Sequence, residues 1–554
     1  MLSSEQRKEA EKIALKNAFQ HGGRADLGAV LAKLLGQYQD LRKDVQALRD
    51  ELNGIINSVN SMSQTELKKA VEEFSPETLA RNDKPIQHRL PDLENVNGPV
   101  VMRLAPSPSG PLHVGHSRMA ILNDEYVKRY GGRLILRIED TNPANIDPIA
   151  YDQIPKDLEW LGVNVTEVVI QSDRFDLYYS EARNLIKKGG MYACTCPPNE
   201  FKSYISKGES CPHRNLPAER SLEIFDGMLN GEFHPGKAVL VVKTDLNHPN
   251  PAVRDWIAFR ISAAKHPRQG RKYRVYPTMN WGVAIDDHFL GLTHVIRGKD
   301  HISNTEKQRY VFRYNGWKEP VYYHYGLVNF PNVILKTSII KKGIANGTYS
   351  GWDDIRLGTL MAMKRRGYSP NTFRRYWIES GLREINSEFS VEIFNSMNKE
   401  LIDPTTQRLF FTPNPVKLLL RGFHGGNVEL QNHPTNKSMG KRTYTLSADP
   451  FLYVSSSDWD TIPDGTVVRL KELGNVEKSG TEIRFREREL VDRKLKIIQW
   501  CPPDSFPFQV LKPDGTVDKG IIEGFARNFR GVAQLERYAY VNIGEEGYGY
   551  FLHK

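Results

Sequence analysis

RLAPSPSGPLHVGH, at residues 103–116, is the stretch that decides the fold class of this chain. It joins an apolar run, which predicts a buried strand, to a stretch with helical periodicity. Its three prolines and two glycines predict a tight turn whose backbone can approach a ligand closely. His113 and His116 follow at the helix entrance, so both imidazoles can face one pocket. They can donate hydrogen bonds to a phosphate whose charge grows during nucleophilic attack.

Strands and helices alternate along the chain after this turn. Strands are expected within residues 98–106, 134–138 and 168–170, and helices at 116–129, 149–161 and 175–188. The alternation resumes over residues 276–345. It predicts a doubly wound parallel sheet of the Rossmann type, which binds ligands at the carboxyl ends of its strands.

The remaining regions differ in composition. Residues 1–98 predict a helical N-terminal extension that ends in a proline-containing linker, and residues 191–275 predict an inserted domain. Residues 346–410 predict a helical connector, and short β-like runs between turns predict a β-barrel over 411–554. The extension is expected to be a helical domain packed on itself. A helical arm that binds a protein partner is the alternative.

Composition limits the class of protein. The chain has 554 residues, of which 39% are hydrophobic and 26% charged, and this excludes collagen-like and wholly disordered proteins. A net charge of +10 permits a polyanionic partner. No run of about 18 apolar residues predicts a membrane span, and the charged N-terminus is unlike a signal peptide. Four cysteines indicate reduced thiols or metal ligands, and so a cytoplasmic location.

Three of the four cysteines form a cluster with a histidine. Cys194 and Cys196 make one clamp, Cys211 and His213 make a second, and 14 residues separate the two clamps. Three thiols and one imidazole satisfy the tetrahedral ligand set of structural zinc and leave no open position for catalysis. A set of buried free thiols is the alternative, and Cys501 is expected to be a plain core residue.

The turn at 103–116 resembles the HIGH signature of class I aminoacyl-tRNA synthetases. With LRIEDTNPA at 136–144 it is similar to the glutamyl-tRNA synthetases of archaeal type. MNWGVAIDDHFLGLTHVIRGKDH at 279–301 and GWDDIRLGTLMAMKRRGY at 351–368 agree, so the resemblance covers about residues 99–554. It implies a Rossmann catalytic core in two halves (99–190 and 276–345) and an acceptor-binding insertion (191–275), which carries zinc in some members. It also implies a helical connector and a β-barrel region that binds the anticodon.

The resemblance implies a two-step reaction of ATP, with Mg²⁺, L-glutamate and tRNA(Glu). The glutamate carboxylate attacks the α-phosphate of ATP, and the 3′-terminal adenosine of the tRNA then takes the glutamyl group. By motif, the glutamate-binding residues are Arg103, Ala105, Ser107, Glu139, Asn280 and Arg297. Those that bind ATP are Pro108, Gly110, His113, Gly115, His116, Leu335, Thr337 and Ser338, and the catalytic ones are His113, His116, Lys336 and Lys341. Guanidinium groups suit the glutamate carboxylates because they can bond bidentately, and Glu139 matches the acid that holds the ammonium.

Two positions depart from the family pattern. Met279 stands where the family often has a tyrosine that meets the substrate, so Asn280 or Tyr276 is expected to substitute. The lysine-bearing KMSKS loop is matched by LKTSIIKKG at 335–343, where Thr337 replaces the second lysine. A cation is still needed beside the leaving pyrophosphate, and the candidates are Lys336, Lys341 and Lys342.

Other functions stay open from the sequence alone. A glutaminyl-tRNA ligase is disfavoured, because a buried Arg297 would be underpaired facing a neutral amide, but charging of tRNA(Gln) beside tRNA(Glu) is compatible. The altered lysine loop suggests a non-catalytic tRNA-binding paralogue, and a ligase that modifies a tRNA base is a further alternative. RNA phosphates are expected to meet the basic run Lys364, Arg365, Arg366, Arg374 and Arg375.

Overall fold

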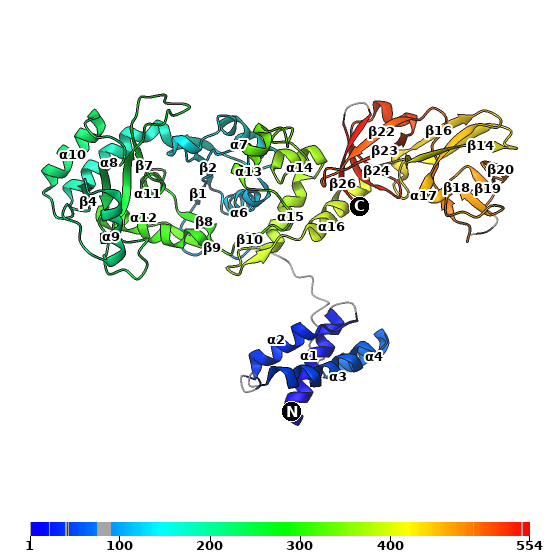
Figure 1. Cartoon of the computed structure of the whole chain (residues 1–554), viewed down its shortest axis with the longest axis horizontal. Coiled ribbons are helices and arrows are strands. Elements are labelled where there is room, and N and C mark those ends of the chain that lie inside the picture. Colours follow the sequence, from blue (N-terminus) through cyan, green and yellow to red (C-terminus); the bar gives the residue numbers. More distant parts are fainter. Residues whose placement is uncertain are drawn as a thin grey trace. The chain divides into compact units, whose positions relative to one another are not determined.

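The computed structural model describes residues 2–20, 23–38, 41, 44–74, 90–490, 492, 494–544 and 547–554. It divides into two compact units, residues 1–88 and 89–554 (Figure 1). Of the predicted linker, Pro91 and Gly98 are described, whereas Pro76 and Pro85 lie outside the described residues. Among the helices that the structure describes, none is long and apolar enough to cross a lipid bilayer.

The N-terminal unit contains the helices α1 (Ser4–Gln20), α2 (Leu27–Gln37), α3 (Val45–Asn60) and α4 (Gln64–Phe74). Asp26 and Asp44 cap α2 and α3 by accepting hydrogen bonds from the backbone three residues later. The apolar stripes of the helices form one shared core, which includes Ala14, Leu34, Leu52 and Val71. The helices therefore pack on one another, as expected.

The second unit opens with a parallel sheet in the order β1 (Val101–Leu104), β2 (Arg133–Ile138) and β3 (Glu167–Ile170). The helices that follow these strands are α6 (Val114–Tyr130), α7 (Ile149–Trp160) and α8 (Phe175–Lys187) (Figure 1). Each begins and ends within two residues of its predicted position. The left-handed Gly131 ends α6, because only glycine adopts that backbone conformation without strain.

A second parallel pair, β8 (His294–Gly298) and β9 (Val321–Tyr325), lies beside this sheet. Thr293 N donates to Val101 O (3.0 Å) and Val101 N donates to the Thr293 hydroxyl (3.0 Å), so β8 neighbours β1. The helices of this half are α11 (Met279–Phe289) and α12 (Ile302–Asn315). The strand order is doubly wound, which confirms the predicted Rossmann-type core. Arg103 and Arg297 lie near the carboxyl ends of the two adjoining strands.

An antiparallel sheet interrupts the core in the order β4 (Met191–Cys194), β5 (Val239–Val242), β6 (Trp256–Ile261) and β7 (Val275–Pro277). It is accompanied by α9 (Pro198–Lys207) and α10 (Ala218–Asn230). β7 crosses the predicted boundary at residue 275, because it pairs with β6 before the chain enters α11. Buried aromatic residues, including Phe225, Phe259 and Trp281, join the sheet to α8 and α11.

The predicted connector contains α14 (Leu360–Arg366), α15 (Pro370–Ser380) and α16 (Val391–Ile402), and α13 (Thr337–Ala345) precedes it. The short strands β10 (Val328–Asn329) and β11 (Ser387–Glu388) pair in parallel. Phe373 and Trp377 of α15 are buried in the same core as α6. Trp377 Nε1 donates to Ser117 Oγ (2.7 Å), which fixes α15 against the helix that the two histidines begin.

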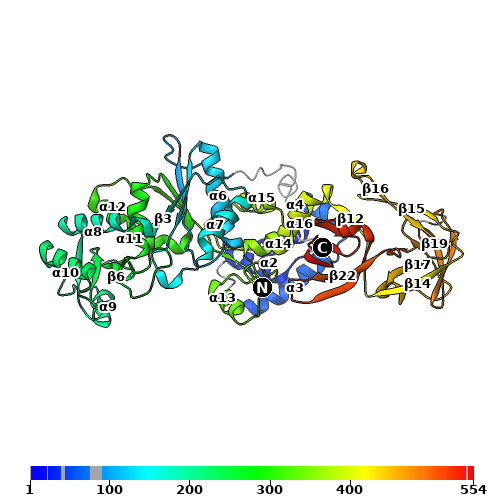
Figure 2. The same cartoon turned by 90° about the horizontal axis from the view of Figure 1, so that it is seen from above.

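The C-terminal part consists of two larger sheets and a two-stranded hairpin (Figures 1 and 2). The seven-stranded sheet contains β12 (Gln407–Leu409), β13 (Phe411–Pro413), β22 (Phe506–Leu511), β23 (Val517–Ile522), β24 (Gly531–Leu535), β25 (Ala539–Ile543) and β26 (Tyr548–His553). The six-stranded sheet contains β14 (Pro415–Arg421), β17 (Phe451–Ser455), β18 (Val467–Leu470), β19 (Gly474–Ser479), β20 (Glu482–Glu487) and β21 (Ile497–Ile498). The strands β15 (Gly426–Gln431) and β16 (Lys441–Leu446) form a two-stranded hairpin. The short helix α17 spans Ser456–Trp459. These barrel-like sheets confirm the predicted β-rich region, and Cys501 is fully buried among their side chains.

Candidate active site

The two signature histidines cap the helix that they begin. His113 is the N-cap of α6, and its Nδ1 accepts from Gly115 N (3.1 Å). His116 Nδ1 accepts in return from His113 N (3.2 Å). This is a capping box made of two imidazoles, in which both Nδ1 atoms are acceptors. Each neutral ring therefore carries its proton on Nε2, which is left to donate to a ligand.

Backbone hydrogen bonds tie this turn to the lysine-bearing loop. Val114 N donates to Gly358 O (3.0 Å), and Gly358 N donates to Ile334 O (3.0 Å). Leu360 N donates to Leu112 O (2.9 Å), so both sides of the turn are held by the segment 358–360. Leu335, directly before the lysines, packs so closely on Gly358 that an added Cβ would lie 2.4 Å from Leu335 Cδ2. The loop is thus brought beside the histidines through Gly358.

The structure separates the two predicted catalytic lysines by their surroundings. Lys336 is exposed and is the N-cap residue of α13, which Thr337 begins and Ser338 continues. Lys341 Nζ lies 3.3 Å from Asp147 Oδ2, and Asp147 N donates to Pro108 O (2.8 Å). Lys341 is therefore anchored to the signature turn itself. α13 begins with the half-buried hydroxyl of Thr337, the exposed hydroxyl of Ser338 and the positive end of its helix dipole.

Two buried arginines lie where the glutamate carboxylates were predicted. Arg103 is 3% exposed and Arg297 is 6% exposed, and the Nε of each has no hydrogen-bond partner among the described residues. Burial lowers the pKa of Arg103, and burial together with the charge of Arg103 lowers that of Arg297 to about 10. Buried, mutually repelling cations with open donors favour an anionic ligand between them.

A third buried arginine, Arg137, holds the acids of this site and was not predicted. It donates to Glu139 Oε1 from Nε (3.2 Å) and NH2 (3.0 Å), and to Asp287 Oδ1 from NH1 (2.6 Å). Although burial acts in the opposite direction, Asp287 and Glu139 raise the pKa of Arg137. Because Arg137 occupies both acids, Arg103 and Arg297 keep their charge for a ligand. Arg137 lies within the motif segment 136–144 and Asp287 within 279–301. Their places in these segments were the only signal from which the sequence could have revealed the pair.

The structure distinguishes the two substitutes for the missing tyrosine at Met279. The hydroxyl of Tyr276 donates to Tyr273 O (3.2 Å), so it is used locally. Asn280 lies 8% exposed on α11, and its Oδ1 accepts from Gln308 Nε2 (2.9 Å), whose own Oε1 accepts from Arg297. Asn280 therefore belongs to the surroundings of Arg297, whereas Tyr276 does not.

The other predicted loop residues are brought to the same place. Glu139 N donates to Pro106 O (3.1 Å), which ties the acid to the turn that carries Ala105 and Ser107. At Gly110 the ring of Trp352 fills the space in which a side chain would stand, 2.7 Å from the position of a Cβ. At Gly115 the rings of His113 and Phe330 lie close by, at 3.0 and 3.4 Å. Both glycines thus permit aromatic packing around the turn.

The predicted zinc ligands converge in the insertion. One ligand atom from each of Cys194, Cys196, Cys211 and His213 lies within 4.8 Å of the others. The sulfurs of Cys194 and Cys211 are 3.8 Å apart, which matches the separation of about 3.8 Å in a tetrahedral site with Zn–S bonds of ~2.3 Å. His213 Nε2 meets the Thr195 hydroxyl at 2.9 Å, leaving Nδ1 toward the thiols. The donor set fits zinc.

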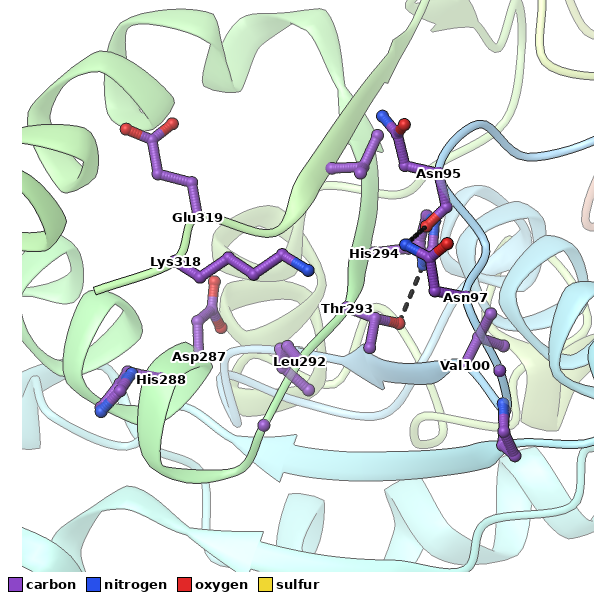
Figure 3. Close-up of a pocket in the computed structure, with 14 residues that line it drawn as sticks. Asn95, Asn97, Val100, Asp287, His288, Leu292, Thr293, His294, Lys318 and Glu319 are labelled. Carbon is purple, nitrogen blue, oxygen red and sulfur yellow. Dashed lines mark hydrogen bonds between the residues drawn. The ribbon is translucent and has the colours of Figure 1, made fainter. Parts of the chain in front are cut away.

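Figure 3 shows a cavity of about 500 Å³ that sequence reasoning missed. Residues directly before β1 and β8 line it, including Val100 and Thr293, so it lies at the amino ends of these strands. Lys318 reaches across the opening, and Asp287 borders it (Figure 3). Ligands of doubly wound sheets bind at the opposite, carboxyl ends of the strands. The cavity thus opens at the other end of the strands from the arginine and histidine site, and Asp287 borders both.

The basic run of the connector is paired within the protein. Arg365 donates to Asp353 (3.0 Å), and Arg366 donates to the carbonyl oxygens of Phe551 and Leu552. Arg374 pairs with Asp124 and Glu125, and Arg375 pairs with Glu379 and Glu400. The guanidinium groups thus join α14–α16 to neighbouring elements, and the contact of this basic run with RNA phosphates stays a prediction. Charge runs in sequence do not reveal such partners.

Comparisons with known proteins agree with this geometry. Residues 99–404 match the family model of the tRNA synthetases class I (E and Q), catalytic domain, and residues 406–495 match the anti-codon binding domain of the same group. The chain is 57% identical over 546 residues to the glutamate–tRNA ligase of Thermoplasma volcanium, covering 98% of this chain and 99% of that protein. It is 43% identical over 553 residues to the glutamate–tRNA ligase of Methanothermobacter thermautotrophicus, covering 98% of each. The chain belongs to the class I tRNA synthetases of the E and Q group.

Proposed function

We propose that this chain is an ATP-dependent ligase that joins L-glutamate to the 3′ end of tRNA(Glu) in the cytoplasm. The observation that carries the proposal is the pair of buried arginines, Arg103 and Arg297, which have open donors and lie within electrostatic reach of Glu139. When Arg137 is counted against Asp287, two cations and one acid remain, which match a substrate with two carboxylates and one ammonium. The relatives named as glutamate–tRNA ligases support the same substrate.

In the first step a carboxylate oxygen of glutamate attacks the α-phosphorus of ATP, and the bond to the bridging oxygen of pyrophosphate breaks. The Nε2–H groups of His113 and His116 donate to phosphate oxygens as negative charge builds up. Lys336 and Lys341 stabilise the departing pyrophosphate, and the backbone at Leu335, Thr337 and Ser338 contacts the nucleotide. Mg²⁺ would neutralise phosphate charge when bound. In the second step the tRNA hydroxyl attacks the acyl carbon and releases AMP.

Glutamate is favoured over glutamine by the burial of Arg297. A neutral amide would leave this guanidinium desolvated and without a counter-charge, which costs more than a lost neutral hydrogen bond. Discrimination between amino acids does not require discrimination between tRNAs, so tRNA(Gln) is a second candidate acceptor.

The remaining parts receive supporting roles in this proposal. Zinc at Cys194, Cys196, Cys211 and His213 braces the acceptor-binding insertion at 191–275. The two halves of the catalytic core are residues 99–190 and 276–345, the connector is 346–410, and the region 411–554 reads the anticodon. The helical extension at 1–98 offers a surface for a protein partner.

The proposal is tested by charging purified tRNA(Glu) and tRNA(Gln) with labelled glutamate and, separately, labelled glutamine, each with ATP. Esterification of glutamate to tRNA(Glu) is the expected result. Charging of tRNA(Gln) with glutamate would identify an enzyme that accepts both tRNAs. Charging of neither tRNA with glutamate would reject the proposal, and use of glutamine alone would assign a glutamine ligase.

A further inference from the structure

A chain of buried amides starts at Arg297 and crosses two helices. Arg297 NH2 donates to Gln308 Oε1 (2.8 Å), and Gln308 Nε2 donates to Asn280 Oδ1 (2.9 Å). Asn280 Nδ2 donates to Asn304 Oδ1 (3.1 Å), and Asn304 Nδ2 meets His301 Nδ1 at 2.9 Å. Gln308 is fully buried on α12, and the chain links β8, α12 and α11.

Arg297 sets the direction of every hydrogen bond in this chain. Its guanidinium can only donate, so the oxygen of Gln308, not the nitrogen, must face it. Each amide then presents its nitrogen to the oxygen of the next one, and the last nitrogen requires an acceptor at His301 Nδ1. His301 is therefore neutral, with its proton on Nε2, which lies 3.7 Å from Asp300 Oδ2. Turning any one amide over would place two donors or two acceptors in contact.

Arg297 NH2 has a second acceptor on the same helix, Thr305 Oγ1 at 2.6 Å. Gln308 and Thr305 lie three residues apart on α12 and use both hydrogens of NH2. The Nε of Arg297 has no partner within the described part of the chain. α12 thus fixes one end of the guanidinium and leaves donors at the other end for a ligand.

We infer that Gln308 is a positioning residue for Arg297, and that the amide chain from Gln308 to His301 sets how this guanidinium presents its charge to the substrate carboxylate. The inference rests on the proposed function, since it assigns Arg297 to glutamate. A guanidinium held by one rigid partner network loses less freedom when it binds a carboxylate. An amide as the holding group leaves the charge of Arg297 uncompensated, whereas a carboxylate at that position would neutralise it.

The test compares Gln308→Met with Asn398→Leu, which replace buried amides by apolar side chains of similar size. Asn398 of α16 bonds to Thr372 of α15 and to His553 of β26, and it serves as the control. In tRNA charging, Gln308→Met is expected to raise KM for glutamate at least about tenfold, because a hydrogen bond to a charged group is lost. The KM for ATP is expected to stay within about twofold, and glutamate is expected to lose part of its advantage over glutamine. An unchanged KM for glutamate would overturn the inference.

Gln308→Glu is the second variant, because it keeps an acceptor for Arg297 and resembles glutamine in size. Its negative charge should compete with the substrate, so KM for glutamate is again expected to rise, and an unchanged value contradicts the inference. A third measurement uses the wild-type chain and so does not depend on whether a variant folds. Nitrogen NMR of labelled histidine, assigned by loss of the signal in His301→Gln, should show His301 Nδ1 without a proton. A proton on Nδ1 would refute the amide chain, whereas a wild type that charges no tRNA with glutamate would refute only the proposed function.

Discussion

The imidazoles of His113 and His116 stack with their centroids 3.7 Å apart and an angle of 25° between the planes. Two cationic rings would repel each other at this distance. Burial lowers the pKa of His116 to about 4, and burial together with His116 lowers that of His113 well below the usual range. Both rings are therefore neutral donors at physiological pH, and their fixed dipoles, not positive charge, meet the phosphate.

Two substitutions of His116, compared with each other, separate its role as a helix cap from its role as a hydrogen-bond donor to phosphate. His116→Ala removes both, so we expect charging to fall by about 100- to 1,000-fold, as for other lost transition-state donors. The unfolding free energy should drop by only about 1 kcal/mol, the value of a helix cap. His116→Gln keeps an acceptor for His113 N and should restore the stability but only part of the rate. Equal charging by His116→Ala and wild type would contradict the donor role.

The same histidine predicts how stability varies with pH. Its pKa is about 4 in the folded protein against an ordinary value of 6.5, so the unfolded chain takes up the proton more readily. The contribution of this pKa difference to the free energy of unfolding is complete above pH 6.5. It is lost as the pH falls toward 4, by about 3 kcal/mol in total. Urea denaturation at pH 7, 5.5 and 4.5 should show this loss in the wild type. His116→Gln should lose less over the same range, and identical losses would disprove the assignment.

Local sequence signals were enough to predict the helices in the first half of the catalytic core. Prolines and glycines end the segments around α6, α7 and α8, and the periodicity between them is strong. The predicted domain boundary between residues 275 and 276 divides β7. A short apolar strand of the inserted sheet cannot be told by its residues from a strand of the core that follows. Only its pairing with β6 assigns β7 to the inserted sheet, and the local sequence does not reveal that pairing.

The candidate site was predictable only where a motif carried the residue. Arg103, Glu139 and Arg297 lie in such segments, and the structure brings them together. The partners that set their charge come from distant positions, since Asp287 is 150 residues from Arg137. Gln308 lies outside the quoted motifs and has no periodic signal. Surface arginines such as Arg374 look free in sequence until their acidic partners fold against them.

Arg297→Gln tests the basis of amino acid selection. The variant loses the cation but keeps an amide that can donate, so the site should accept glutamine more readily. We expect kcat/KM for glutamate to fall at least about 100-fold, because two or more hydrogen bonds from a charged group are lost. The ratio of glutamate to glutamine charging should fall with it. A variant that kept the wild-type ratio would show that Arg297 does not read the side chain.

Zinc content tests the cysteine cluster. Elemental analysis of the purified chain should give about one zinc per molecule, and Cys196→Ser should lower this value. Because the ligands join β4 to the loop before α10, chelation should lower the melting temperature. Cys501→Ala is the control, since this buried thiol lies in the C-terminal core and should leave the zinc content unchanged. A wild-type chain that is purified without zinc and melts normally would exclude the site.

Gly358→Ala tests whether the histidine turn and the lysine loop act as one assembly. A Cβ at this position would lie 2.4 Å from both Leu335 Cδ2 and Val333 Cγ1, so these side chains must shift and push on the loop that they belong to. The lysines would then move relative to the histidines, although neither group has been altered. Since only the chemical step uses both groups, kcat should fall by about tenfold or more while KM for glutamate changes little, because catalysis depends on sub-ångström placement. Gly351→Ala is the matched control, as its Cβ would meet only Asp353 Oδ1 at 3.2 Å. If both variants kept wild-type kcat, the hydrogen bonds through Gly358 would hold the fold without setting the distance between the catalytic groups.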